Sequence, residues 1–306
     1  MAASFRSGFA CFVGRPNAGK STLTNALVGD KIAITSSKPQ TTRHAIRGLV
    51  HTDGAQLVLV DTPGLHRPRT VLGERLNDLV RTTWADVDTV AMCFPSDQRV
   101  GPGDKYLVKE LAGLRRKPVL AVATKTDLVS PARLAEHLLA IQAAGEEAGI
   151  RWREIVPVSA AQGAQVGLLR DLLIDTLPEG APLYPDGQLT DEPAETLVAE
   201  VVREAALEGV RDELPHSLAV VVDEIVPRED RSAHKPLTDV RVHVFVERDS
   251  QKGIIIGHKG ARLREIGAAS RRQIEKILGT PVYLDLHVKV AKDWQRDPKQ
   301  LRRLGF

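Results

Sequence analysis

The sequence has few of the features that mark secreted or membrane-spanning proteins. Its two cysteines in 306 residues are too few for a disulfide framework, and both Cys11 and Cys93 stand in apolar runs, where a thiol packs as a small hydrophobic group. No run of eighteen apolar residues occurs, so no transmembrane helix is expected. Residues 1–6 lack the apolar core of a signal peptide, and there is no low-complexity tract or long-period repeat. We therefore expect a cytoplasmic protein.

A glycine-rich motif stands near the start of the chain. Residues 14–21 read Gly-Arg-Pro-Asn-Ala-Gly-Lys-Ser, which matches the phosphate-loop pattern G-x-x-x-x-G-K-[S/T]. An apolar strand is predicted before it at 9–13 and a helix after it at 21–28. Backbone N–H groups of such a loop turn toward a phosphate, and the helix adds its positive end. Lys20 should reach the β- and γ-phosphates, and Ser21 should hold Mg²⁺. The candidate nucleotide-binding residues are Gly14, Arg15, Pro16, Asn17, Ala18, Gly19, Lys20 and Ser21.

A second strand-end motif indicates which class of nucleotide enzyme this is. The apolar run 57–60 ends in Asp61-Thr62-Pro63-Gly64. Asp61 can join the Mg²⁺ shell, and the backbone N–H of Gly64 can meet a γ-phosphate. Walker-type ATPases more often carry a second acidic residue directly after this Asp, whereas here Thr62 follows. The motif therefore favours a GTPase, although by itself it is equally compatible with an ordinary Pro-Gly turn.

Two later loops bear on the choice of base. The predicted strand 119–123 ends in Thr124-Lys125-Thr126-Asp127. The Asp127 carboxylate can accept hydrogen bonds from N1–H and the N2 amino group of guanine, and adenine has no donors at those positions. A site that leaves a buried carboxylate unpaired rejects the wrong base. The Lys125 stem would lie along the ring, and a backbone N–H of the loop Ser159-Ala160-Ala161 could meet the guanine O6.

The first 177 residues read as one α/β domain. Helical periodicity at 104–114, 131–148 and 166–176 alternates with the apolar runs, which predicts a mainly parallel sheet with helices on both faces. Ligands of such sheets lie outside the carboxyl ends of the strands, where all four loops fall. Residues 178–193 carry prolines and glycines typical of a linker, and we expect a second domain over 194–306.

The second domain carries a signal for RNA. A helix is predicted at 194–209, strands at 217–225 and 240–247, a basic helix at 261–278 and a final strand at 282–290. After three isoleucines comes Gly257-His258-Lys259-Gly260, which resembles the G-x-x-G loop of KH domains. Phosphate contacts are expected from Lys259, Arg262 and Arg264. From residue 251 onward the chain has thirteen basic and five acidic residues, a net of +8, against +3 for the whole chain. Some of these charges will simply face solvent, and a membrane surface is another possible partner for a basic face.

Together these motifs resemble the Era family of bacterial translation-factor-related GTPases, over the whole length of the chain. The segment Lys38-Pro39-Gln40-Thr41-Thr42-Arg43-His44 is similar to that family's first switch. The resemblance implies a P-loop GTPase domain followed by a smaller α+β, type II KH domain. It also implies that one of the paired threonines, with Thr42 preferred over Thr41, closes on Mg²⁺ and the γ-phosphate, beside Lys20 and Gly64. The implied partner is 16S ribosomal RNA near its 3′ end, the implied task is maturation of the small ribosomal subunit, and peripheral membrane association is a family property.

The sequence departs from the wider GTPase pattern at two positions. Thr124 stands where the base-reading motif of related GTPases usually has Asn, whose side chain braces the neighbouring loops. The Thr hydroxyl is shorter and is expected to lose this brace, so nucleotide affinity should fall while guanine preference stays with Asp127. Leu65 stands where small signalling GTPases place a water-orienting Gln, so the attacking water must be handled otherwise. Asn17 matches an Asn that holds K⁺ in cation-dependent relatives, but an Asn there also suits a left-handed turn.

Two other functional classes fit the same motifs. The first is a GTP-dependent signalling or membrane factor whose KH-like domain binds protein or lipid. The second is an RNA-binding module whose nucleotide site is only structural, with Thr124 marking its decay. Turnover of GTP, and competition between RNA and the partner, separate these hypotheses from a GTPase that binds RNA.

Overall fold

The computed structural model describes residues 4–36, 38, 41–65, 68–114, 117–210, 214–229 and 236–306. The chain divides into two compact units. The first comprises Met1–Thr35, Thr42–Arg67 and Leu76–Asp191. The second comprises Glu192–Phe306 together with two segments from the earlier sequence, Ser36–Thr41 and Pro68–Arg75. Each unit is described by itself below.

The first unit is built on a sheet whose order within the described residues is β2-β3-β1-β4-β5-β6. Its strands are β1 (Arg6–Val13), β2 (Ile46–Thr52), β3 (Ala55–Asp61), β4 (Thr89–Pro95), β5 (Val119–Thr124) and β6 (Ile155–Pro157). β2 runs antiparallel to β3, and the other neighbouring strands are parallel. The prediction of a mainly parallel sheet is therefore confirmed.

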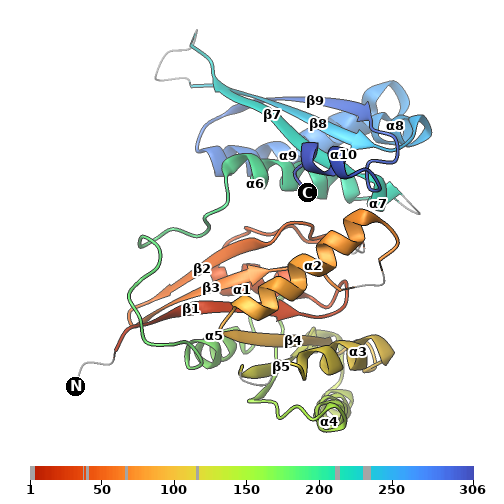
Figure 1. Cartoon of the computed structure of the whole chain (residues 1–306). Helices are drawn as coiled ribbons and strands as arrows, with labels where there is room; N and C mark the ends of the chain where they lie inside the picture. Colours follow the sequence, from red (N-terminus) through yellow and green to blue (C-terminus); the bar gives the residue numbers. More distant parts are fainter. Residues whose placement is uncertain are drawn as a thin grey trace. The chain divides into compact units, whose positions relative to one another are not determined.

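Helices cover both faces of this sheet (Figure 1). They are α1 (Lys20–Val28), α2 (Val71–Asp86), α3 (Pro102–Leu111), α4 (Pro131–Ala148) and α5 (Val166–Ile174), with a 3₁₀ turn η1 (Thr126–Leu128). On one face α1 and α5 pack through residues such as Leu23 and Leu169. On the other face Trp84, Leu107 and Ile141 bring α2, α3 and α4 into a second core. Both cysteines are buried and free, as their apolar surroundings predict.

The segment predicted as a linker lies along the first unit as far as Asp191. The Leu49 N–H donates to the Leu189 carbonyl (2.9 Å), and the Gln56 side chain accepts from the backbone of Leu183 (2.6 Å) and Tyr184 (2.9 Å). These bonds tie the segment to strands β2 and β3. The predicted linker is therefore bound to the first unit before α6 (Ala194–Leu207) begins.

The second unit has a three-stranded sheet, in the order β7-β8-β9, with helices against one face (Figure 1). Its elements are α6 (Ala194–Leu207), α7 (Leu214–Ser217), β7 (Ala219–Pro227), β8 (Thr238–Val246), α8 (Asp249–Ile256), the 3₁₀ turn η2 (His258–Gly260), α9 (Ala261–Leu278), β9 (Val282–Val290) and α10 (Pro298–Arg303). β7 pairs antiparallel and β9 parallel with the central β8. Val202, Val244 and Ile266 represent the core beneath this sheet. The predicted α+β character of this domain is confirmed.

Two early segments belong to the second unit because its residues hold them. The Arg203 guanidinium donates to the Thr41 carbonyl, and the Leu72 N–H donates to the Gln295 carbonyl (3.1 Å). Pro39 and Gln40 of the expected first switch lie outside the described residues. Across the part of the chain that the structure describes, no helix has both the length and the apolar character needed to cross a bilayer.

Candidate nucleotide and nucleic-acid sites

The predicted phosphate loop forms a tight turn between β1 and α1. A Cβ on Gly14 would lie 2.9 Å from the Cys93 carbonyl oxygen, so a side chain does not fit there. Asn17 (φ 62°) and Gly19 (φ 89°) both adopt the left-handed conformation that the turn requires. Gly19 is also the N-cap of α1, and its cap has no side-chain hydrogen bond. The first N–H groups of α1 therefore follow a backbone turn and accept no side-chain cap. Such free N–H groups at a helix N-terminus can bind an anion.

Lys20 is buried in this loop. Its Nζ donates to the carbonyls of Gly14 and Arg15, both at 3.2 Å. Burial lowers the pKa of Lys20 from its ordinary value, and the nearby Asp61 carboxylate opposes the shift. A desolvated cation held by two carbonyls can transfer its N–H donors to phosphate oxygens, because phosphate is the stronger acceptor.

Three oxygen-bearing side chains converge next to Lys20. Ser21 Oγ lies 2.7 Å from Asp61 Oδ2 and 3.0 Å from Thr42 Oγ1, and Thr42 Oγ1 lies 3.4 Å from Asp61 Oδ2. Two hydroxyls and a carboxylate are the hard donors that Mg²⁺ prefers, so the residues present fit this ion. Clusters of three or more His, Cys, Asp or Glu suited to a metal do not occur among the described residues.

The Asp61-Thr62-Pro63-Gly64 segment lies directly against the phosphate loop. A Cβ on Gly64 would come within 2.8 Å of the Pro16 nitrogen, so glycine allows this close approach. Thr62 is buried and donates to the Phe12 carbonyl at 3.3 Å. Leu65 is 8% exposed and packs in the core with α2 and α3. A leucine side chain packed in the core does not orient water.

The base-reading segment makes a direct hydrogen bond to the phosphate loop. Thr124 Oγ1 donates to the Ala18 carbonyl at 2.7 Å. This is the bracing contact that we expected to be lost when Thr replaces Asn, and the shorter hydroxyl makes it. Lys125 adopts a left-handed conformation (φ 57°) and its Nζ lies 3.3 Å from Asp97 Oδ2. Thr126 begins η1, which carries Asp127.

Asp127 and the Ser159 loop are joined by a side-chain bond. Ser159 Oγ donates to Asp127 Oδ1 at 2.6 Å, so one carboxylate oxygen is already positioned. The Ser159 N–H donates to the Ala164 carbonyl (3.1 Å). The backbone donors of this loop that could meet a guanine O6 are therefore those of Ala160 and Ala161. The structure thus brings together the four strand-end loops that the sequence analysis selected.

The Gly257–Gly260 loop connects α8 to α9 at the surface. Gly257 (φ 71°), Lys259 (φ 49°) and Gly260 (φ 76°) all have positive φ, and Gly260 caps α9 without a side-chain bond. His258 and Lys259 are exposed. A Cβ on Gly257 would lie 2.6 Å from Arg262 Cβ, so this glycine is also needed for packing.

The two arginines after the loop make different contacts within the second unit. Arg262 donates to the carbonyls of Ala205 and Glu208 at the end of α6 and pairs with Glu265 at 3.3 Å. Its guanidinium therefore ties the first turn of α9 to the end of α6, and the phosphate contact expected of Arg262 stays a prediction. Arg264 is exposed, donates to the Lys259 carbonyl at 3.0 Å and lines a neighbouring groove.

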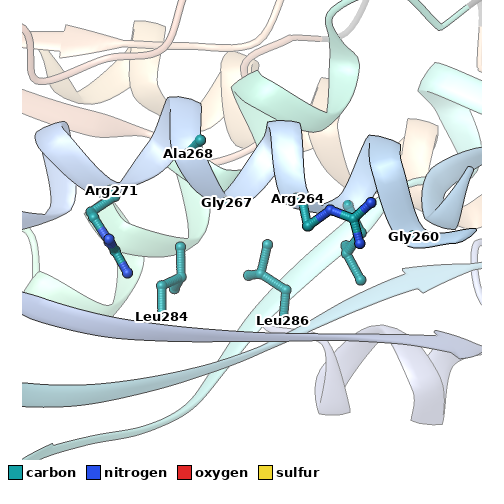
Figure 2. Close-up of a pocket in the computed structure, with 8 residues that line it drawn as sticks. Gly260, Arg264, Gly267, Ala268, Arg271, Leu284 and Leu286 are labelled. Carbon is teal, nitrogen blue, oxygen red and sulfur yellow. The ribbon is translucent and has the colours of Figure 1, made fainter.

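This groove, of about 570 Å³, lies between α9 and β9 (Figure 2). Arg264 and Arg271 extend from α9, and Leu284 and Leu286 rise from β9 toward the helix. Gly267 and Ala268 line the groove between the two arginines, and neither has a side chain that extends beyond Cβ. Arg271, Leu284 and Leu286 were not among the predicted site residues. Their signals were available, because residues seven apart share a helix face and alternate strand residues share a sheet face.

Two family models match this chain, one in each unit. A family model described as "50S ribosome-binding GTPase" matches residues 9–125, and a KH domain model matches residues 213–295. The chain is similar to "GTPase Era" of Streptomyces coelicolor, with 69% identity over 301 residues that cover 98% of this chain and 95% of the relative. A Nocardioides protein of the same description is also 69% identical, over 98% of this chain and 96% of its own length.

Two solved structures match nearly the whole chain. One is a single-residue variant of Aquifex aeolicus Era bound to GDP·AlF4⁻, with TM-score 0.92 and 36% identity. The other is Era in complex with MgGDPNP and nucleotides 1506–1542 of 16S ribosomal RNA, with TM-score 0.92 and 37% identity. Each covers 98% of this chain and 99% of the matched chain.

Proposed function

The chain belongs to the Era family of GTPases, and from this premise we propose that it is a nucleotide-controlled RNA-binding protein that acts on the 3′ region of 16S ribosomal RNA and assists maturation of the small ribosomal subunit. The observation that carries the proposal is the similarity, over 98% of the chain, to a structure that holds both a GTP analogue with Mg²⁺ and that RNA segment. The two glycine-rich loops supply a site for each ligand.

For the nucleotide, the proposal assigns roles to the residues around the phosphate loop. Lys20 donates to the β- and γ-phosphates, and the Gly64 N–H meets the γ-phosphate. Ser21, Thr42 and Asp61 hold Mg²⁺, which when bound offsets the charge that develops on the phosphates. Asp127 selects guanine, with Lys125 along the ring and the Ala160 and Ala161 amides toward O6.

For the RNA, the proposal places the sugar-phosphate backbone on the Gly257–Gly260 loop and the bases in the groove. The glycines let the chain approach closely, and α9 offers its N-terminal N–H groups. Arg264 and Arg271 are seven residues apart on α9, which is about 10 Å along a helix, so they stand near the two ends of the groove. Leu284 and Leu286 give unstacked bases an apolar surface.

A finer proposal concerns K⁺. Asn17 is exposed beside the phosphates' expected position, and its φ of 62° already gives it a structural role in the turn. If Asn17 also holds K⁺, the hydrolysis rate should rise in KCl over NaCl at equal ionic strength, and the Asn17→Gly variant, which keeps the turn, should lose that difference. Equal hydrolysis rates in both salts would show that Asn17 does not hold K⁺ and only adopts the conformation that the turn requires.

The test of the proposed function is GTP turnover with and without an oligonucleotide of the 16S 3′ end. The intact protein should hydrolyse GTP slowly and bind the oligonucleotide, and Lys20→Ala should lose turnover but retain RNA binding. A protein that turns over GTP but does not bind this RNA would instead support the signalling alternative, with a protein or lipid on the second unit. Binding of RNA with no turnover would support a structural nucleotide site.

A further inference from the structure

The phosphate loop carries an arginine whose side chain leaves the loop. Arg15 follows Gly14, and its Nε lies 2.7 Å from Asp104 Oδ1 at the start of α3. Its Nη2 donates to Gln98 Oε1 at 3.1 Å. The side chain of Asp104 is 1% exposed and that of Arg15 is 30% exposed. This ion pair therefore has one fully desolvated partner, unlike an ordinary surface pair.

Three residues, Gln98, Gly103 and Asp104, surround the Arg15 side chain. We call this site the arginine socket. The second carboxylate oxygen of Asp104, Oδ2, accepts the Gly101 N–H at 2.9 Å, so the carboxylate is fixed by the start of α3. A Cβ on Gly103 would lie 2.9 Å from Arg15 Cδ, so the absence of a side chain there makes room for the arginine stem. A buried carboxylate needs such partners, because leaving it unpaired is costly.

The backbone of the same arginine supports the phosphate site. The Arg15 carbonyl accepts both Lys20 Nζ and the Ala18 N–H, each at 3.2 Å. A rotation of the peptide after Arg15 would displace the acceptor of Lys20 and the turn that ends at Gly19. The side chain is thus fixed to α3 while the carbonyl is fixed inside the loop.

We propose that Asp104, assisted by Gln98 and Gly103, is a positioning residue that holds the phosphate loop in its nucleotide-binding conformation through Arg15. Asp104 does not touch the nucleotide. Without the socket, part of the binding energy is spent on ordering the loop, so affinity falls equally for GDP and GTP. Chemistry in the bound state is unaffected. The proposal rests on the assignment of residues 14–21 as the phosphate loop.

The test compares Asp104→Asn, Arg15→Met and the double variant in the full-length protein. Dissociation of fluorescent GDP and of a GTP analogue should be about tenfold faster in each single variant, as expected for one charged hydrogen bond. The double variant should be no faster than the singles, because both changes break the same contact. In Asp104→Asn, the hydrolysis rate at saturating GTP should stay within about twofold of the unmodified protein, because Asp104 does not touch the reacting groups.

A matched control lies on the same helix. Lys105 pairs with Glu147 at 2.5 Å, and both side chains are more than half exposed, so Lys105→Met should leave nucleotide dissociation unchanged. If Asp104→Asn only lowers the unfolding temperature, and its dissociation rates match those of Lys105→Met, the proposal is overturned. Additive effects of the two substitutions would overturn it as well. If Asp104→Asn does not fold, the nucleotide dissociation rates of Arg15→Met test the proposal in the same way. Normal nucleotide binding by Lys20→Ala would instead show that residues 14–21 are not the phosphate loop. That result would refute the proposed function and is distinct from a failure of the arginine socket.

Discussion

The two glycine-rich loops of this protein use the same backbone device in different surroundings. Each ends at a glycine in the left-handed conformation that caps a helix: Gly19 (φ 89°, ψ 12°) before α1 and Gly260 (φ 76°, ψ 13°) before α9. Neither cap has a side-chain hydrogen bond. The first N–H groups of both helices are therefore left for another acceptor, and a phosphate suits both positions.

The loops differ in how their lysines are held. Lys20 is 6% exposed and lies in a loop fixed by Asp104, Thr124 and its own carbonyls. Lys259 is exposed, beside an open groove. A buried cation makes a strong contact at one defined position, whereas an exposed cation makes a weak one that salt screens. The first loop therefore suits one small ligand, and the second suits a chain of repeating phosphates.

The largest expected effect comes from the buried lysine. Lys20→Ala removes a desolvated cation that no other side chain of the loop replaces, so the affinity for GTP should fall at least about 100-fold. The loss should be nearly the same at low and at high salt, because a buried contact is screened little. Calorimetry at two salt concentrations measures it. A loss that shrinks strongly in high salt would mean that Lys20 contacts phosphate in a solvated setting, which would remove the contrast between the loops.

Substitution of the capping glycine of the second loop should have the next largest effect. Gly260→Asp sets a negative charge at the backbone site and strains a position with φ of 76°, so RNA affinity should fall by about 30-fold or more. GTP affinity should not change. Adding Gly257→Asp would abolish RNA binding, but its Cβ would meet Arg262 at 2.6 Å, so the double variant needs an unfolding control. Unchanged RNA affinity in Gly260→Asp would place the RNA site elsewhere.

The base-reading loop has no counterpart among the described residues of the second unit. A substitution in this loop should therefore affect nucleotide binding and leave RNA binding unchanged. Asp127→Asn replaces an acceptor by a donor opposite position 2 of the base, so preference should move from guanine toward xanthine. We expect about a tenfold or larger loss for GTP and a gain for XTP, measured by competition with labelled nucleotide. Equal binding of ATP and GTP by the unmodified protein would refute the role of Asp127.

Sequence patterns predicted the elements with local signals. Residues 131–148 and 261–278 are helices with those bounds, and 282–290 is a strand, because strong periodicity coincides there with capping residues. The isoleucine run at 254–256 gave no clear prediction, since β-branched residues favour strands, and it lies at the end of α8. Tertiary contacts outweigh that propensity: Ile255 is buried in the core of the second unit. Strands β2 and β4 and helix α2 were not assigned.

The site was predictable where a motif is contiguous and not where it depends on distant partners. The four loops could be found from spacing alone. Arg15 and Asp104 are 89 residues apart, and Arg262 reaches a helix end 54 residues earlier. No local pattern indicates such pairs, because the fold alone brings them together. The contact of Arg262 with α6, and the socket of Arg15, therefore needed the structure.

The exposed lysine should show a smaller effect with the opposite salt behaviour to Lys20. Lys259→Ala removes one phosphate contact, so RNA affinity should fall about threefold to fivefold at moderate salt. The slope of log affinity against log salt should flatten by about one unit. RNA titrations over a series of salt concentrations give both numbers. A loss that is independent of salt would indicate that Lys259 stabilises the loop and does not meet a phosphate.

The smallest effect concerns Thr124, where the structure changes the original expectation. The sequence suggested that Asn at this position would restore a missing brace and tighten nucleotide binding. The Thr124 hydroxyl already donates to the Ala18 carbonyl at 2.7 Å, and both residues are buried. Thr124→Val keeps the shape and removes the donor, so GDP and GTP binding should weaken by the ~0.5–1.5 kcal/mol of one hydrogen bond. Thr124→Asn should change binding by less than this. Calorimetry on the two variants distinguishes the views: unchanged binding in Thr124→Val would show that the hydroxyl is dispensable, and a gain of about tenfold in Thr124→Asn would show that threonine is a defect in this loop.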